Sequence, residues 1–186
     1  MASASPRRKE LLEQIGLRFK VDPSEYDEEM ASDSEPHGMA RGLSLGKARS
    51  AARKHRNAII IAADTLVVLD GTVFGKPHTN AQAREMLRAL NGRTHSVITG
   101  FTILDAETGK VLSRSVETRV HMRKLSLKEI DSYVRTKEPL DKAGGYAIQG
   151  WGAVLVDRID GDYSNVVGLP LSELSEALKE LGVRVL

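Results

Sequence analysis

The alternation of apolar and polar positions divides the chain into predicted strands and helices. The most continuous apolar run, residues 58–65, reads Ala-Ile-Ile-Ile-Ala-Ala-Asp-Thr, and its β-branched content is typical of a strand buried on both faces. This strand is expected to end on Asp64 and Thr65. In open α/β sheets ligands bind at the carboxyl ends of such strands, which favours Asp64 as a catalytic base or metal ligand. A turn or capping role for Asp64 is equally compatible with its position.

The remaining segments alternate between the two periodicities. Helices are predicted where apolar residues recur at helical spacing or a capping signal opens the segment: residues 6–15, 37–55, 81–90, 126–136 and 171–181. Thr79 or Asn80 is expected to cap the third of these helices, and Ser126 with Glu129 forms a capping box at the start of the fourth. Strands are predicted at residues 17–21, 66–69, 72–74, 94–104, 110–122, 152–159 and 183–186. Asp70-Gly71 is a strong hairpin signal, and residues 160–170 form a polar, glycine-bearing loop.

A basic pair lies at the start of the first predicted helix. Ser5 is a preferred N-cap residue and Pro6 suits the first helical position, which places Arg7 and Arg8 in an exposed first turn. Cations are unfavourable at that end of the helix dipole unless an anion binds there. A phosphate would meet free backbone N–H groups and guanidinium groups together, so we favour a phosphate site over a solvated basic patch.

Two motif matches carry little weight by themselves. Residues 42–46 read Gly-Leu-Ser-Leu-Gly, but a hydrolase nucleophile elbow needs a strand before the serine, and this segment has helical periodicity. We therefore reject Ser44 as a nucleophile and regard the match as chance. Residues 75–77 read Gly-Lys-Pro, and Pro77 stands where a P-loop has its serine or threonine. Lys76 can still serve as a phosphate cation on this turn. Solvent contact is the default role of Lys47.

A second dense polar stretch spans residues 138–150. It contains two acids, a lysine and a double glycine ahead of Gln149. The glycines allow close backbone approach to a ligand or simply form a tight turn. The Gln149 amide both donates and accepts, which suits the edge of a base, although a structural role is the commoner one. Trp151 is expected in the core.

Composition excludes several classes of protein. The chain has no cysteine, which excludes disulfides and thiolate chemistry and fits a cytoplasmic protein. No stretch approaches the roughly 20 apolar residues of a membrane span, and no apolar signal segment precedes Arg7. The net charge of +2 is too small to indicate general nucleic-acid binding. A length of 186 residues fits a single domain, 1–186.

The acidic segment around residues 27–29 is of a kind that is usually solvated surface, but it can also supply a carboxylate to a metal. The five histidines lie at positions 37, 55, 78, 95 and 121, and none of these spacings is typical of a zinc site. Any metal is therefore expected to be a hard cation held by carboxylates and phosphate oxygens.

These features are parts for binding a polyphosphate, a metal and a base, and together they resemble the Maf family. The resemblance runs in order over almost the whole chain. The matching motifs are Ser3-Ala4-Ser5-Pro6-Arg7-Arg8, Ala63-Asp64-Thr65, Gly75-Lys76-Pro77, Gly92-Arg93-Thr94-His95, residues 138–150 and Asn165-Val166-Val167-Gly168-Leu169-Pro170.

The resemblance implies a nucleoside triphosphate pyrophosphatase that uses an activated water and a divalent metal, Mg²⁺ or Mn²⁺. It also implies an α/β fold with a mixed, elongated twisted sheet and flanking helices forming two lobes around a cleft, similar to inosine triphosphate pyrophosphatases. A house-cleaning role in the cytoplasm follows, and a homodimer is left open. The family usually has several apolar residues before the Ser-Pro-Arg-Arg motif, so the first strand of the family is expected to be short or absent here.

The resemblance also assigns roles to individual residues. Asp64 would be the general base or metal-linked acid, with Glu28 as a second metal ligand. Lys47, Lys76 and Glu28 complete the expected catalytic set. The expected substrate-binding residues are Ser5, Arg7, Arg8, Thr65, Glu138, Asp141, Lys142 and Gln149.

The pattern of residues 141–150 is similar to the subgroup that prefers dTTP and UTP. Two alternatives are weighed against this activity. One is a nucleotide- or nucleic-acid-binding regulator of cell division, which needs no catalysis. The other is a pyrophosphatase for 7-methyl-GTP or modified nucleotides.

Overall fold

The sheet in the described part of the chain has five strands. The computed structural model describes residues 1–26 and 35–186, and its strand order is β2-β1-β3-β4-β5. The strands are β1 (Ile59–Leu69), β2 (Thr72–Phe74), β3 (Thr94–Asp105), β4 (Val111–Met122) and β5 (Val156–Asp160). β1 pairs antiparallel with β2, and β4 with β5.

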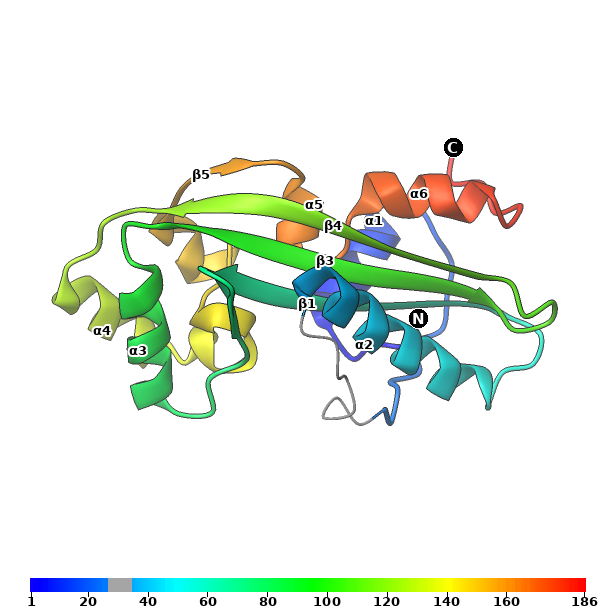
Figure 1. Cartoon of the computed structure of the whole chain (residues 1–186), viewed down its shortest axis with the longest axis horizontal. Helices are drawn as coiled ribbons and strands as arrows, with labels where there is room; N and C mark the ends of the chain where they lie inside the picture. Colours follow the sequence, from blue (N-terminus) through cyan, green and yellow to red (C-terminus); the bar gives the residue numbers. More distant parts are fainter. Residues whose placement is uncertain (27–34) are drawn as a thin grey trace. The chain divides into compact units, whose positions relative to one another are not determined.

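Helices accompany this sheet, as predicted for an α/β fold (Figure 1). The α-helices are α1 (Pro6–Gln14), α2 (Pro36–Ala52), α3 (Asn80–Leu90), α4 (Leu127–Arg135), α5 (Tyr163–Val167) and α6 (Leu171–Lys179). Short 3-10 helices are η2 (Glu138–Asp141), η3 (Ala143–Gly145) and η4 (Gly150–Leu155). Within the described residues, no helix combines the length and the apolar character required to span a membrane.

The chain forms two compact units. Unit 1 comprises Met1–Thr65, Thr99–Val116 and Gly168–Leu186, and unit 2 comprises Leu66–Ile98 and Glu117–Val167. Strands β1, β3 and β4 each contribute residues to both units. That the whole chain forms one domain stays a prediction.

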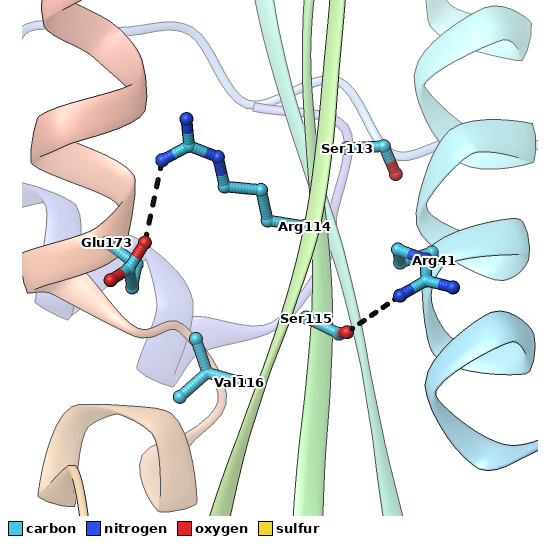
Figure 2. Close-up of a pocket in the computed structure, with 6 residues that line it drawn as sticks. All are labelled: Arg41, Ser113, Arg114, Ser115, Val116 and Glu173. Carbon is cyan, nitrogen blue, oxygen red and sulfur yellow. Dashed lines mark hydrogen bonds and ion pairs between the residues drawn. The ribbon is translucent and has the colours of Figure 1, made fainter.

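Unit 1 is built from helices packed on strand segments. Small apolar residues of α2 meet those of β1 in its core, including Ala48, Ala51 and Ala62. α2 and α6 lie on opposite sides of β4 in this unit (Figure 2). Gly100 allows α2 to approach β3 closely, because a Cβ there would lie 2.2 Å from the backbone of Ala40.

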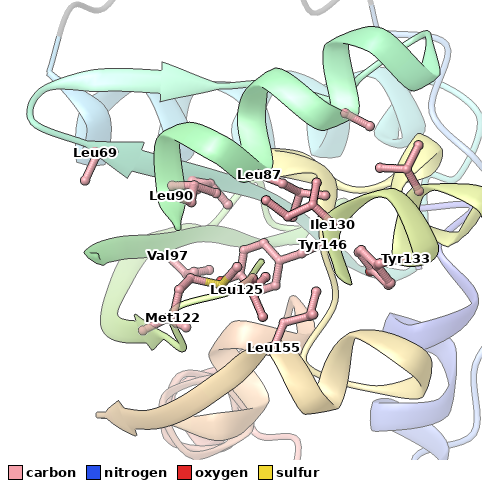
Figure 3. Close-up of a cluster of buried hydrophobic side chains, with 14 residues drawn as sticks. Leu69, Leu87, Leu90, Val97, Met122, Leu125, Ile130, Tyr133, Tyr146 and Leu155 are labelled. Atoms are coloured by element: carbon pink, nitrogen blue, oxygen red, sulfur yellow. The ribbon is translucent and has the colours of Figure 1, made fainter. Parts of the chain in front are cut away.

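Unit 2 contains the larger cluster of buried apolar side chains, which Figure 3 shows. α3 packs against α4 and η3 there. Both helices begin where the sequence predicts. Thr79 accepts the N–H of Gln82 at the start of α3, and Ser126 and Glu129 form the predicted capping box of α4.

Strand β1 corrects the prediction that a strand ends at Asp64. It continues without a break to Leu69, because residues 66–69 are as apolar as residues 59–63 and belong to the same buried strand. The predicted Asp70-Gly71 hairpin to β2 is confirmed. Asp64 therefore lies within a strand rather than at its end.

Other predicted strands are wrong in part. Residues 17–21 and 183–186 form no strand. Near the first of these segments, Met1 donates to the carbonyl of Lys20 at 2.7 Å and accepts the N–H of Asp22 at 3.0 Å, while Ala2 donates to the carbonyl of Ile61 at 2.8 Å. Residues 1–5 likewise form no strand, in agreement with a short or absent first strand.

The segment that follows residue 149 also differs from its prediction. η4 occupies the first half of the predicted 152–159 strand, and only β5 is extended. The predicted loop at 160–170 contains the helix α5. Trp151 is 72% exposed, so its expected place in the core is wrong.

His95 in unit 2 is a buried polar residue within an apolar environment. Its side chain is 3% exposed, and Nε2 lies 2.6 Å from the hydroxyl of Tyr146. Nδ1 has no hydrogen-bond partner in the described residues. Burial lowers the pKa of His95 to about 4, and the neighbouring charge of His121 acts in the same direction.

We expect this histidine to make folding sensitive to acid. The unfolded chain takes up the proton as the pH falls below 6.5, whereas the folded chain takes it up only near 4, so stability falls across that window. The expected loss is roughly 3 kcal/mol once the pH is below the folded pKa. Urea unfolding at pH 7 and pH 4.5 should show a smaller pH-dependent loss in His95→Gln than in the wild type. An equal loss in both proteins would contradict this assignment.

Candidate functional site

The guanidinium group of Arg8 connects three segments of unit 1. Its Nε donates to the carbonyl of Gly168 at 2.8 Å, Nη2 to Thr65 Oγ1 at 2.9 Å and Nη1 to Ser3 Oγ at 3.2 Å. Thr65 is bonded in turn to the buried hydroxyl of Thr99 at 3.0 Å. The hydrogen bonds of Arg8 therefore link the N-terminal segment, β1 and the residues before α6.

Arg7 has a different environment from its neighbour. Its Nε is buried and has no hydrogen-bond partner in the described residues. A buried donor without a partner costs free energy unless a ligand satisfies it. Because Arg7 lies in the first turn of α1, whose N-cap is Ser5, an anion at this point would also meet the positive end of the helix dipole.

Both arginines are partly buried, which corrects the prediction of an exposed first turn. Ser5 accepts the backbone N–H of Arg8 at 3.5 Å and caps the helix as expected. From the sequence alone, Arg7 and Arg8 are assigned the same role, that of phosphate ligands. In the fold, Arg8 donates to three internal partners, whereas the Nε of Arg7 has no hydrogen-bond partner in the described part of the chain.

Asp64 and Lys47 form an ion pair between β1 and α2. Their side chains are 14% and 12% exposed, so the pair is largely shielded from water. The resemblance assigned both residues to catalysis, and the structure brings them together. The default expectation of solvent contact for Lys47 is wrong.

A divalent cation fits this part of unit 1 as a group carried by the substrate. The described residues contain no cluster of three or more His, Cys, Asp or Glu side chains that could hold a metal. Mg²⁺ commonly binds through one or two carboxylates together with substrate phosphates and water, and Asp64 supplies one carboxylate. Glu28, the second expected ligand, lies outside the described residues.

Unit 2 carries the other predicted site residues. Lys76 is exposed on the turn between β2 and α3, and the backbone beside it is fixed because the Gly75 carbonyl accepts the N–H of Gly144 at 3.0 Å. A Cβ on Gly144 would lie 2.9 Å from the side chain of Val67. Gly144 is therefore needed for close packing of η3 against β1.

The acids and the lysine of residues 138–142 interact with one another. Lys142 Nζ donates to the carbonyl of Glu138 at 2.9 Å and to Asp141 Oδ1 at 2.6 Å. The Asp141 side chain is 73% exposed and that of Lys142 is 13% exposed. The carboxylate of Glu138 accepts backbone N–H groups of η4, and Gln149 is the residue that precedes this helix.

Comparison with known proteins identifies the relationship. The profile of the family described as Maf-like protein matches residues 1–181. The chain belongs to the Maf family. It is 50% identical over 186 residues to a protein of Methanosarcina mazei named dTTP/UTP pyrophosphatase, with 100% of this chain and 94% of the relative covered. It is 48% identical over 185 residues to a protein of the same name from Moorella thermoacetica, with coverage of 100% and 95%.

An open depression in unit 1 of this Maf-family chain contains none of the predicted site residues. It has a volume of about 570 Å³ and is lined by Arg41, Ser113, Arg114, Ser115, Val116 and Glu173. Figure 2 shows Arg114 directed toward Glu173 on one side of β4 and Ser115 toward Arg41 on the other. These groups satisfy one another, so the depression is not a candidate for the catalytic site.

Some residues that support the candidate site could not be identified as such from the sequence. Thr99 and Ser3 are hydroxyl residues with no spacing that links them to Arg8, although Ser3 belongs to a matched motif. The glycine in the Asn165–Pro170 match, Gly168, gave the only signal. It has a positive φ of +126°, and its carbonyl accepts a hydrogen bond from Arg8 Nε at 2.8 Å.

We expect the two arginines to respond differently to truncation. Arg8→Ala removes three hydrogen bonds from a charged group and should lower the free energy of unfolding by about 2 kcal/mol or more. Arg7→Ala removes a donor without a protein partner, so its stability should stay near that of the wild type while triphosphate affinity falls. Urea unfolding without nucleotide and a nucleotide titration measure the two effects.

Arg8→Lys is the matched control, because it keeps the charge but cannot reproduce the three directed bonds. It should therefore lose stability as Arg8→Ala does. Equal losses of stability in Arg7→Ala and Arg8→Ala would contradict the distinction between the two residues.

Proposed function

We propose that this chain is a nucleoside triphosphate pyrophosphatase that converts dTTP and UTP to the monophosphate and pyrophosphate. The observation that carries the proposal is the buried Nε of Arg7 at the start of α1, which has no hydrogen-bond partner among the residues that the structure describes. It is a donor prepared for an anion in a chain whose relatives at 45–50% identity are named dTTP/UTP pyrophosphatase.

The reaction requires little from the protein beyond placement and charge. A water oxygen bonds to phosphorus, the anhydride bond between the α- and β-phosphates breaks, and the water proton must be removed. Asp64 is the proposed proton acceptor, held in orientation by its ion pair with Lys47. Arg7 and Lys76 are proposed to neutralise charge on the phosphate oxygens, as is expected when charge develops in the transition state.

A Mg²⁺ or Mn²⁺ ion bound with the triphosphate would polarise the phosphate oxygens and thereby assist the attack of water. Asp64 is the described residue that we propose would hold it, with Glu28 proposed as a second carboxylate. The chain's own contribution is the shielded Asp64–Lys47 pair, which keeps the carboxylate fixed before substrate arrives.

The base is proposed to be recognised by the amide of Gln149. Thymine and uracil share an imide edge with a ring N–H donor between two carbonyl acceptors, and an amide can donate and accept at that edge. Cytosine presents an amino group and an unprotonated ring nitrogen instead. Since a mismatched hydrogen-bonding edge leaves buried polar groups without partners, thymine and uracil should be discriminated strongly from cytosine.

Asp64→Asn should lower turnover of dTTP by a factor of roughly 10² or more, while the chain still binds the nucleotide. The substitution keeps the size of the side chain but removes the charge that accepts the proton. Turnover is measured as pyrophosphate release, and binding by titration with a non-hydrolysable dTTP analogue. An unchanged rate would refute the assigned mechanism and would favour the non-catalytic regulator, which has no need of Asp64.

Wild-type chain should hydrolyse dTTP and UTP well and CTP and GTP poorly when each is supplied with Mg²⁺ and pyrophosphate is measured. The difference between dTTP and UTP should be small, because contact with a single methyl group contributes only ~1–3 kcal/mol at most. Gln149→Glu should reduce the preference, since a carboxylate replaces the amide donor. Preference for GTP or for 7-methyl-GTP would instead support the other pyrophosphatase alternative.

A further inference from the structure

The backbone that carries Gln149 begins a helix with no cap of its own. Gln149 is the N-cap residue of η4, and its side chain makes no capping hydrogen bond. The first N–H groups of a helix need an acceptor from elsewhere. Asn, Asp, Ser and Thr are the usual residues for that task, and glutamine is not among them.

Glu138 performs the capping from a distant position in the sequence. Its Oε2 accepts the backbone N–H of Trp151 at 2.9 Å, and its Oε1 accepts that of Gly152 at 3.3 Å. The two carboxylate oxygens thus hold the two residues at the start of η4 that follow Gly150. Hydrogen bonds to a charged acceptor are stronger than those between neutral groups.

Tyr133 holds the other side of Gln149. Its hydroxyl accepts the backbone N–H of Ala147 at 3.1 Å and donates to Glu138 Oε1 at 3.4 Å. Tyr133 is 5% exposed and belongs to the apolar cluster of unit 2, where Figure 3 shows it among the buried side chains. The backbone is therefore fixed two residues before Gln149 and two residues after it, by one connected pair of side chains.

The glycines of this segment lie where a side chain would not fit. A Cβ on Gly150, whose φ is +64°, would lie 3.0 Å from Glu138 Oε2. A Cβ on Gly152 would lie 2.2 Å from the carbonyl oxygen of Ala147. The turn around Gln149 is consequently packed tightly against the carboxylate that caps it.

We propose that Glu138 is a positioning residue for base selection, which acts by capping η4 and so fixing the backbone of Gln149. This inference rests on the proposed function and replaces direct substrate binding as the role of Glu138. Because Glu138 supplies the cap, the Gln149 amide is not needed for it and stays available to a base. A fixed amide accepts one edge and rejects another, whereas a mobile amide can adapt to both.

The test compares Glu138→Ala with Glu129→Ala. Glu129 is a matched control, because it is also a carboxylate of unit 2 that caps a helix, in this case α4. Glu138→Ala should lower kcat/KM for dTTP by about tenfold to 100-fold, with a smaller loss for CTP, so that the dTTP/CTP ratio falls. Glu129→Ala should lower the melting temperature and leave that ratio unchanged. Glu138→Gln, which keeps one good acceptor oxygen, should lie between the wild type and Glu138→Ala.

Trp151 provides a readout that does not depend on turnover. It is the only tryptophan of the chain, and its backbone N–H is one of the two bonded to Glu138. Fluorescence anisotropy of Trp151 should fall in Glu138→Ala, because the residue is released, and should stay unchanged in Glu129→Ala.

The outcomes distinguish a failure of the positioning role of Glu138 from a failure of the proposed function. A selective wild type, together with a Glu138→Ala variant of unchanged dTTP/CTP ratio, would overturn the positioning role and leave the proposed function intact. An equal loss of the ratio in Glu129→Ala would also overturn it, because the effect would then reflect general destabilisation. A wild-type chain that hydrolyses none of the nucleotides would overturn the proposed function and the inference with it.

Discussion

The guanidinium group of Arg8 is the interaction on which the candidate site of unit 1 depends. A charged group that is partly removed from water must be hydrogen-bonded, and Arg8 obtains its partners from Ser3, Thr65 and Gly168. These residues lie before α1, in β1 and ahead of α6. The requirement to satisfy one cation therefore fixes the start of α1, on which Arg7 is carried, relative to the strand that carries Asp64.

The polar residues of the candidate site in unit 1 and those around Gln149 in unit 2 are arranged in the same way. In each unit, one charged side chain forms internal hydrogen bonds, and a second polar side chain takes no part in them. Arg8 braces the N-terminal segment, and the Nε of Arg7 has no protein partner in the described residues. Glu138 caps η4, and the amide of Gln149 makes no capping bond. Such internal support gives a ligand-binding group a fixed orientation, which is what selective recognition requires.

Local signals in the sequence were reliable wherever the structure depends on short-range contacts. Ser5, Thr79 and the Ser126–Glu129 box cap their helices as predicted, because a cap involves residues only two or three positions apart. The rejection of Ser44 as a nucleophile is confirmed, since it is fully buried within α2 and bonded to Thr102. The wrong predictions concern segments governed by distant partners. Residues 150–155 form η4 because Glu138 accepts their N–H groups, and no local pattern contains that information.

The α/β character, most helix starts, the β1–β2 hairpin and, through ordered motifs, membership of the Maf family could be predicted from the amino-acid sequence. These features follow from periodicity, capping and motif order, which can be read from the order of residues along the chain. The folded structure was needed to show that Arg7 and Arg8 are not equivalent, that Asp64 is paired with Lys47, and that Glu138 caps the helix that follows Gln149. Each of these features depends on donors and acceptors that lie 13 to 160 positions apart in the sequence, from Glu138 with Trp151 up to Arg8 with Gly168, and folding alone brings them together.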